Sequence, residues 1–148
     1  MSLECLIGPE GNLLENNPEN ARRLRVQNPI LSNKELRAIR NISNANWKTK
    51  TIDLSYLKKD GLSAMKNRLD EVCEEAEAAI HDEYSFIILS DKNTSQSHMS
   101  LSSLLACSSI HHYLTERQLR SKIGIVIETG EARDCLLYTS DAADERHC

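Results

Sequence analysis

Residues 85–89 read Ser85-Phe86-Ile87-Ile88-Leu89, a short run of apolar, aromatic and β-branched side chains. An apolar run of this length without polar alternation is typical of a strand that is buried on both faces, as in a parallel sheet. We therefore expect this segment to be a central strand, with the rest of the fold arranged around it.

Both flanks of this strand predict helices. On its amino side, apolar side chains recur at steps of three and four, the pattern of a helix with one buried face. These residues are Leu62, Met65, Leu69, Val72, Cys73, Ala76, Ala79 and Ile80. On its carboxyl side, residues 90–99 predict a polar loop, and residues 102–119 predict a second helix. Its apolar residues are Leu104, Leu105, Ile110 and Leu114.

Two further strands complete the pattern. Residues 51–56 alternate between polar and apolar, and residues 122–129 hold a β-branched run closed by Gly130. The order is then strand, helix, strand, helix, strand, which implies parallel strands joined by right-handed crossovers. This predicts an α/β fold: a βαβαβ unit over residues 51–134, as part of an incomplete doubly wound (Rossmann- or flavodoxin-like) parallel sheet.

Residues 1–50 predict a lead-in of turns and short helices. Asn17 and Pro18 suit the start of a helix over residues 19–25. Ser32 with Glu35 three positions later is a capping box for a second short helix, whose apolar side carries Leu36 and Ile39. Residues 41–50, rich in Asn and Lys, predict a polar connection.

Residues 135–148 do not fit the pattern, because they begin where a helix should pack on the third strand. The string Cys135-Leu136-Leu137-Tyr138-Thr139-Ser140 and its continuation are similar to translated sequencing-adapter DNA. We expect residues 135–148 to be a non-native tail.

Composition excludes several classes of function. The formal net charge is −4, and no aromatic residues interleave with the small basic groups, which argues against a nucleic-acid partner. No apolar run approaches the roughly 20 residues that a membrane helix needs, and residues 1–14 do not predict a signal peptide. The five cysteines form no CxxC pair, which predicts buried or indifferent thiols. They are Cys5, Cys73, Cys107, Cys135 and Cys148.

Ligands of open α/β sheets bind beyond the carboxyl ends of the strands, where this sequence places Ser90-Asp91 and Glu128-Thr129-Gly130-Glu131. Asp91 and Glu128 are the candidate pair of carboxylates. Two carboxylates there suit acid–base chemistry or magnesium, and equally suit the ordering of loops. We interpret them as loop-ordering residues.

Histidines and glycines give no stronger candidate. His111 and His112 are adjacent on a predicted helix and point about 100° apart, so they suit one shared metal ion poorly; we expect one to face the sheet and the other solvent. His98 adds no fitting spacing. Gly8-Pro9-Glu10-Gly11 suits a turn better than an anion site. No catalytic, cofactor-binding or metal-binding residue is therefore predicted.

Five strings, taken in this order and spacing, resemble the large subunit of glutamate synthase. They are residues 1–14 (MSLECLIGPEGNLL), 28–32 (NPILS), 88–91 (ILSD), 103–106 (SLLA) with His111-His112, and 124–133 (GIVIETGEAR). The resemblance runs from Met1 to about Asp134. It places the chain in the central domain of that family, and it implies that both ends are truncations, since the matching Met is internal there.

The resemblance implies a structural connector between a glutaminase domain and an FMN-binding synthase domain, which are its expected partners in the same polypeptide. The parent enzyme would make L-glutamate from L-glutamine and 2-oxoglutarate with FMN and a 3Fe-4S cluster. Electrons would come from NAD(P)H or ferredoxin, and a small subunit is a further expected partner.

The expected compartment is the cytoplasm, or the plastid in a photosynthetic eukaryote. The piece alone is expected to be inactive. The alternative is a stand-alone flavodoxin-like module that binds a small ligand near Asp91 and Glu128.

Overall fold

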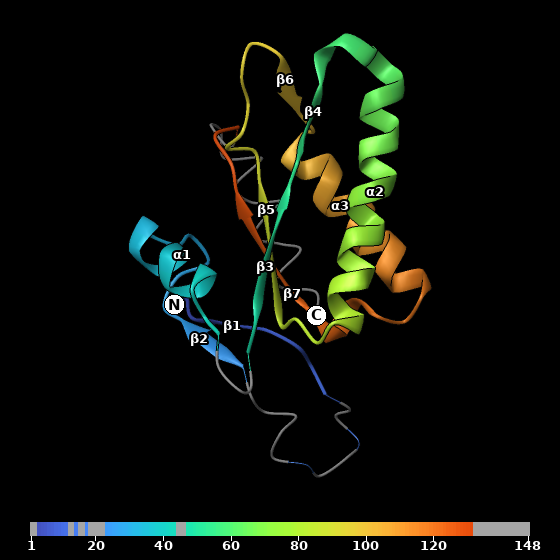
Figure 1. Cartoon of the computed structure of the whole chain (residues 1–148). Coiled ribbons are helices and arrows are strands. Elements are labelled where there is room, and N and C mark those ends of the chain that lie inside the picture. The colour runs from blue at the N-terminus through green and yellow to red at the C-terminus, as the bar shows by residue number, and fades with distance from the viewer. Residues whose placement is uncertain (1–2, 12–13, 15–16, 18–22, 44–46, 132–148) are drawn as a thin grey trace.

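A computed structural model describes residues 3–11, 14, 17, 23–43 and 47–131. Its centre is a three-stranded parallel sheet of β3 (Thr49–Asp53), β5 (Phe86–Ser90) and β7 (Gly124–Glu128), in the order β3-β5-β7 (Figure 1). The predicted α/β class with parallel strands is confirmed. The central position of β5 is confirmed as well, because all five of its residues are buried.

Two long helices cover one face of the sheet, which we call the helix face. They are α2 (Gly61–His81) and α3 (Ser103–Glu116). Each crossover moves one strand further in the same direction, so the same right hand places both helices on the same side. The core of this face is aliphatic, and it consists of Ile52, Leu54, Val72, Cys73, Ala76, Ala79, Ile87, Leu89, Leu101, Ala106, Cys107, Ile110, Leu114, Ile123 and Ile125.

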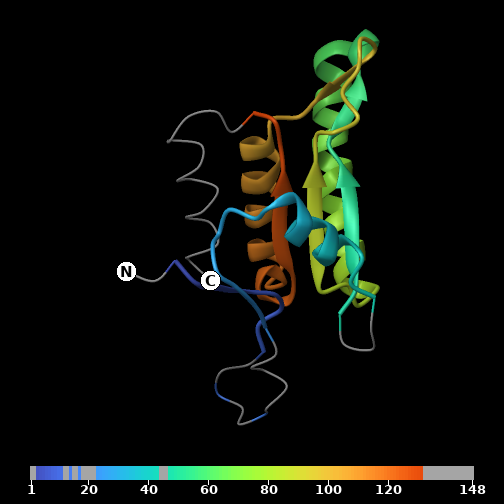
Figure 2. The same cartoon turned by 90° about the vertical axis from the view of Figure 1, so that its left-hand side faces the viewer.

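The opposite face is covered by three short elements from the amino-terminal part of the chain, and we call it the amino-terminal face. An antiparallel pair, β1 (Cys5–Ile7) and β2 (Leu24–Val26), lies there with α1 (Asn33–Arg40). Figures 1 and 2 show these elements across the sheet from α2 and α3. The core of the amino-terminal face is smaller than that of the helix face and consists of Ile7, Val26, Leu36, Ile39, Phe86, Ile88 and Val126.

The helix predicted over residues 19–25 is wrong where it can be compared, because Leu24–Val26 is the strand β2. Residues 18–22 lie outside the described part of the chain. Tertiary pairing overrides the local helix signal here. Val26 is 8% exposed in the core, and Arg25 points outward to the carboxylate of Glu4, at 2.6 Å. β1 was likewise missed by the sequence analysis, since three residues give too short a pattern.

The capping box that starts α1 is confirmed. The Ser32 Oγ accepts a hydrogen bond from the Glu35 backbone N–H at 3.3 Å, and the Glu35 carboxylate accepts from the Ser32 N–H at 2.7 Å. Hydrogen bonds from the Ser32 side chain and backbone lower the pKa of Glu35. Leu36 and Ile39, the predicted apolar side, are the buried residues of this helix.

The strand predicted over residues 51–56 is two strands that belong to different sheets. β3 ends at Asp53, and β4 (Ser55–Leu57) leaves to pair antiparallel with β6 (His98–Ser100). β6 lies in the stretch predicted as loop. Buried Leu54 marks the bend, where its N–H donates to Ser90 O and its carbonyl accepts from Leu101 N–H, both at 2.9 Å. Alternation of polar and apolar residues predicts a strand but not the strand with which it pairs. The sequence therefore does not reveal the division of residues 51–56 between β3 and β4.

The helices α2 and α3 match their predicted segments closely. Two of the predicted apolar residues are exposed. Leu62 is 81% exposed, because the first turn of α2 extends beyond the sheet, and Leu105 of α3 is 38% exposed. Short 3-10 turns precede α2 (Lys58–Asp60) and follow α3 (Arg120–Lys122). Within the part of the chain described, none of the helices has the length and apolar character needed to cross a bilayer. The predicted tail, residues 135–148, lies outside the described residues, and the domain boundaries at 50 and 134 stay predictions.

Candidate functional site

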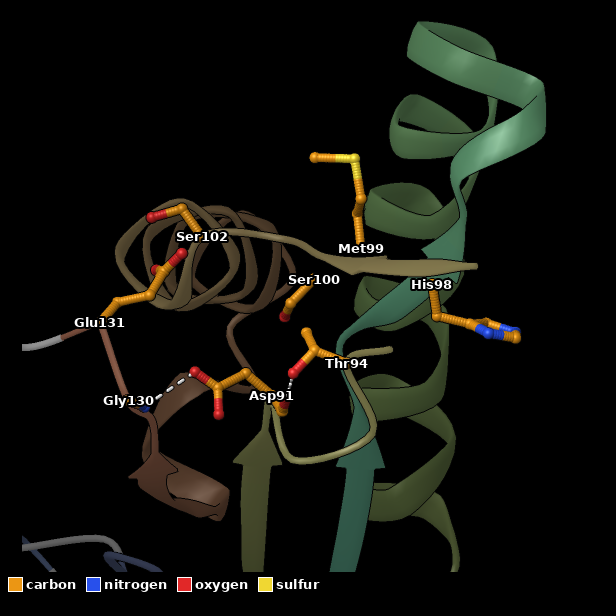
Figure 3. A pocket seen from close by; sticks show the side chains of 8 residues that line it. All are labelled: Asp91, Thr94, His98, Met99, Ser100, Ser102, Gly130 and Glu131. Atoms are coloured by element: carbon orange, nitrogen blue, oxygen red, sulfur yellow. Dashed lines mark hydrogen bonds between the residues drawn. The ribbon is translucent and has the colours of Figure 1, made fainter. Parts of the chain in front are cut away.

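The polar residues predicted for the strand ends lie at the same edge of the sheet, where Asp91 borders two cavities and Glu128 borders one of them. The loops after β5 and β7 meet there with β6 and the start of α3, around a cavity of about 710 Å³. Figure 3 shows Asp91, His98, Ser102 and Glu131 around it. A second cavity, of about 520 Å³, lies between α1 and the same strand ends. This edge is where a ligand of an open α/β sheet would bind.

Asp91 ties the two loops together. Its carboxylate accepts from the Thr129 Oγ at 2.6 Å and from the Gly130 N–H at 2.9 Å, so the loop after β5 holds the loop after β7. Its carbonyl accepts from the Thr94 Oγ at 3.1 Å, which closes the following turn (Figure 3). The oxygen Oδ2 therefore serves two donors within the chain.

Glu128 is the hub of a second set of contacts. Its carboxylate accepts from the Ser90 Oγ and from an Arg40 guanidinium nitrogen, each at 2.6 Å, and from the Lys92 ammonium at 3.1 Å. Burial by itself raises the pKa of this carboxyl, but the hydrogen bonds from Ser90, Lys92 and Arg40 outweigh it and lower the pKa. A general acid needs the opposite, a pKa raised toward neutrality.

The start of α3 carries its own anion. The Glu131 carboxylate accepts from the backbone N–H of Ser103 at 3.2 Å. The first turn of a helix directs free N–H groups and a partial positive charge outward, which attracts phosphates or carboxylates. Here an internal carboxylate occupies that position and would repel a second anion.

The histidines do not come together as a metal site. The rings of His111 and His112 lie edge to face with centroids 5.6 Å apart. The Nδ1 of half-buried His111 accepts from the Arg120 Nε at 3.1 Å, while His112 is exposed. His98 contacts Ser95 and Ser97 through its own Nδ1. Among residues 3–131 that are described, no three His, Cys, Asp or Glu side chains are arranged to hold a metal ion.

The remaining candidates serve packing. Cys73 and Cys107 are buried and Cys5 is half-buried; Cys135 and Cys148 lie outside the described residues. Burial raises the pKa of the Cys73 thiol, which makes it less reactive. Gly8 adopts a positive φ of 130° against the ring of Phe86, where other residues would be strained. In the same loop, Glu10 donates its N–H to Ser121 O at 2.6 Å.

Two members of the strand-end cluster, Arg40 and Lys92, were missed by the sequence analysis, and so was the contact that Glu131 makes with the start of α3. Arg40 reaches Glu128 from α1 across 88 residues, Lys92 follows Asp91 in a polar loop, and Glu131 caps a helix that begins 28 residues earlier. Each is an ordinary charged residue in its local context. A contact across this sequence separation leaves no periodicity or spacing that would reveal it.

The comparison with known proteins decides the family. The sequence model of the glutamate synthase central domain matches residues 1–139. The chain belongs to the glutamate synthase central domain family. This confirms the resemblance stated from the five strings of sequence.

Relatives with different electron donors match the same region. The NADH glutamate synthase of Schizosaccharomyces pombe is 40% identical over 96% of this chain, and that of Saccharomyces cerevisiae is 39% identical over 90%. The NADPH glutamate synthase large chain of Bacillus subtilis is 34% identical over 86%. The chain spans only 7%, 6% and 8% of these relatives. These matches do not favour the alternative of a stand-alone flavodoxin-like module.

The strand-end site offers no obvious place for the FMN or the iron–sulfur cluster that the family resemblance implies for the parent. Iron–sulfur clusters are held by groups of cysteine thiolates, and the described thiols form no such group. An FMN phosphate would need an open helix N-terminus or a glycine-rich loop, whereas the start of α3 holds the Glu131 carboxylate. No chemical step is derived through either group.

Proposed function

We propose that this chain is the structural connector of a glutamate synthase, placed between a glutaminase domain and an FMN-binding synthase domain. The parent enzyme would make L-glutamate from L-glutamine and 2-oxoglutarate. The observation that carries the proposal is the match of residues 1–139 to the central domain of the family. Its partners would be the other domains of the same polypeptide.

The strand-end geometry supports a role in architecture. Glu128 joins three parts of the fold: β7, which carries it, β5 through Ser90, and α1 through Arg40. Asp91 joins the loops after the two strands. Polar side chains that bond to one another in this way hold layers in register, and they leave few groups directed at a substrate. A connector between two catalytic domains needs such a fixed geometry.

The cofactors and electron source would then belong to other parts of the parent. We place FMN and the 3Fe-4S cluster in domains outside this chain, and any small subunit or ferredoxin would bind the parent there too. Relatives are named for NADH, NADPH and ferredoxin, and those of spinach and rice are chloroplastic. We propose the cytoplasm as the compartment or, in a photosynthetic eukaryote, the plastid.

The proposal is tested in a full-length enzyme. In the Schizosaccharomyces pombe relative, residues 1–131 of this chain would replace the matching region, with Asp91→Asn or Glu128→Gln as variants. A connector predicts kcat and KM for both substrates within about twofold of the unsubstituted chimera, which is below 0.5 kcal/mol of activation free energy.

The control is the FMN content and thermal stability of each variant. A loss of kcat by about 100-fold, in a variant that keeps its FMN and its melting temperature, would show that the carboxylate takes part in chemistry. The connector proposal would then be wrong.

A further inference from the structure

The cavity of about 520 Å³ beside α1 is lined on one side by a single stripe of that helix. The stripe consists of Asn33, Leu36, Arg37 and Arg40, at positions i, i+3, i+4 and i+7, which share one face of a helix. Leu36 is buried in the core of the amino-terminal face and anchors the helix to the sheet. The polar members of the stripe therefore border the cavity along the side of α1.

The other wall of this cavity comes from the ends of β5 and β7 and the loops that follow them. Its residues are Asp91, Lys92, Thr94, Glu128, Thr129 and Gly130. The lining thus contains three cationic side chains, those of Arg37, Arg40 and Lys92, and two carboxylates. The excess is positive although the formal net charge of the whole chain is −4, so overall composition does not account for it.

The two carboxylates of the lining are already bonded within the chain. Asp91 accepts two hydrogen bonds from the loop after β7, and Glu128 accepts from Arg40 and Lys92. The side chain of Glu128 is 14% exposed, whereas those of Arg40 and Lys92 are 32% and 72% exposed. The carboxylate of Glu128 therefore lies beneath the cations, and positive charge faces the cavity.

The three cations keep donors that the chain does not use. A guanidinium has five N–H donors and an ammonium has three. Arg40 donates to Glu128 through Nη2 alone, and the Lys92 ammonium donates one bond to the same carboxylate. The Arg37 side chain is exposed and has no hydrogen-bond or ion-pair partner among the residues that the structure describes. These donors are available to an anion in the cavity.

The size and lining of the cavity favour a small, non-aromatic oxyanion. Carboxylates and phosphates accept parallel hydrogen bonds from a guanidinium, which fits them better than a spherical anion. The volume lies within the roughly 300–1,000 Å³ of small-molecule sites. None of the lining residues is aromatic, so the cavity offers no surface on which a flavin ring or a base could stack.

We propose that this cavity binds a small oxyanion, a carboxylate or a phosphate, through Arg37, Arg40 and Lys92. The anion bridges α1 to the loop after β5, so its binding stabilises the attachment of the amino-terminal layer to the strand ends. The proposal does not rest on the connector function, which the kinetics of the Asp91→Asn and Glu128→Gln variants test separately.

The experiment uses the full-length Schizosaccharomyces pombe chimera that carries residues 1–131 of this chain. Backbone amide exchange of α1 is followed as inorganic phosphate or malonate is added to about 20 mM, with chloride keeping the ionic strength constant. At least one of the two anions should slow the exchange by about threefold or more, and the concentration dependence gives the dissociation constant. Slowing by phosphate alone or by malonate alone identifies the class of ligand. If neither anion slows the exchange, the proposal is wrong.

Two charge-matched variants of α1 show whether the effect comes from the cavity. Arg37→Gln removes a cation of the lining, and Lys34→Gln removes one from the same helix that does not line the cavity. Arg37→Gln should raise the dissociation constant by about tenfold or more, through the loss of charge-assisted hydrogen bonds, whereas Lys34→Gln should change it by less than about twofold. Both side chains are exposed, so neither change should prevent folding. Equal effects of the two variants would mean a diffuse attraction to a basic helix and would overturn the proposal.

Discussion

The helix face and the amino-terminal face of the sheet are built from the same three strands and are packed in different ways. α2 and α3 lie in the crossovers between the strands, so the chain connection itself places them on the helix face. The amino-terminal face is covered by β1, β2 and α1, which precede the sheet in the chain and do not lie in its crossovers. Long helices that directly connect neighbouring strands can be predicted from the sequence. The positions of short elements that are distant in sequence from the strands depend on tertiary contacts.

The two faces meet in β5, where consecutive residues belong to different cores. Ile87 packs on the helix face, and Ile88 packs on the amino-terminal face beside Phe86. Both isoleucines are 0% exposed. Their side chains are identical, so any difference in the effect of substitution reports on the layer that covers each one.

The largest effect is expected from truncating these two residues. Ile87→Ala should lower the free energy of unfolding by about 4 kcal/mol, and Ile88→Ala by about 2 kcal/mol, within the range for such cavities. Two long helices cannot move easily into the space left by Ile87, whereas the short elements over Ile88 can. Urea unfolding measures both. Equal losses would show that the amino-terminal layer is as rigid as the helix layer.

Gly124 offers a way to overpack the amino-terminal face. A Cβ added there would lie 2.9 Å from a ring carbon of Phe86 and 3.0 Å from the backbone nitrogen of Gly8. Gly124→Ala should therefore cost about 1–3 kcal/mol, since both neighbours must shift. Gly130→Ala is the control, because a Cβ there meets nothing within 4 Å. Comparable unfolding midpoints for the two variants would contradict the close approach.

The helix caps allow a comparison of the same residue type on the two faces. Ser32→Ala should cost about 1 kcal/mol by removing the capping hydrogen bond of α1. Ser102 holds the equivalent position before α3 but makes no side-chain capping bond, so Ser102→Ala should change stability by less than about 0.5 kcal/mol. Thermal unfolding followed by circular dichroism measures both. If Ser102→Ala proved the more costly, the assignment of the caps would be wrong.

The smallest effect concerns the contact from α1 to the sheet through Glu128. The hydrogen bonds from Ser90, Lys92 and Arg40 lower the folded pKa of Glu128 below its ordinary value of 4.5, despite burial. The stability that they confer is then present above pH 4.5 and is lost as the pH falls through the lowered folded pKa. The side chains of Arg40 and Lys92 are 32% and 72% exposed, so these contacts should contribute less than about 1 kcal/mol to the free energy of unfolding.

This pH dependence is read as a difference between two proteins. Unfolding of the wild type and of Glu128→Gln would be measured between pH 7 and pH 3. The stability advantage of the wild type should shrink as the pH falls below 4.5. An advantage that grew toward low pH would mean that the folded pKa is raised, contrary to the hydrogen bonds described.

The parts of the fold that sequence predicts well are those in which local pattern and tertiary role agree. The apolar steps from Met65 to Ile80 predict α2, and the β-branched runs predict β5 and β7, because burial on a given face imposes that spacing. Ser32 and Glu35 predict the start of α1, since a capping box is complete within four residues.

The failures have a common physical reason. Leu24–Val26 lies in a segment that suits a helix, and it becomes a strand because β1 supplies a partner and the sheet supplies a surface for Val26. β4 and β6 exist because Leu54 turns the chain out of the sheet. In each case the decisive contact joins residues that are distant in sequence, so no local pattern records it.

The sequence by itself determined the parallel α/β core, the two long helices, the cap of α1 and the family, because these depend on residue spacing and on residue identities in order. Only the tertiary structure decided that Asp91 and Glu128 are bound by Thr129, Ser90, Lys92 and Arg40, and that Glu131 covers the start of α3. The physical reason is that the partners of a charge are set by where the folded layers place it, over tens of residues, while a helix or strand is set by neighbours a few residues away.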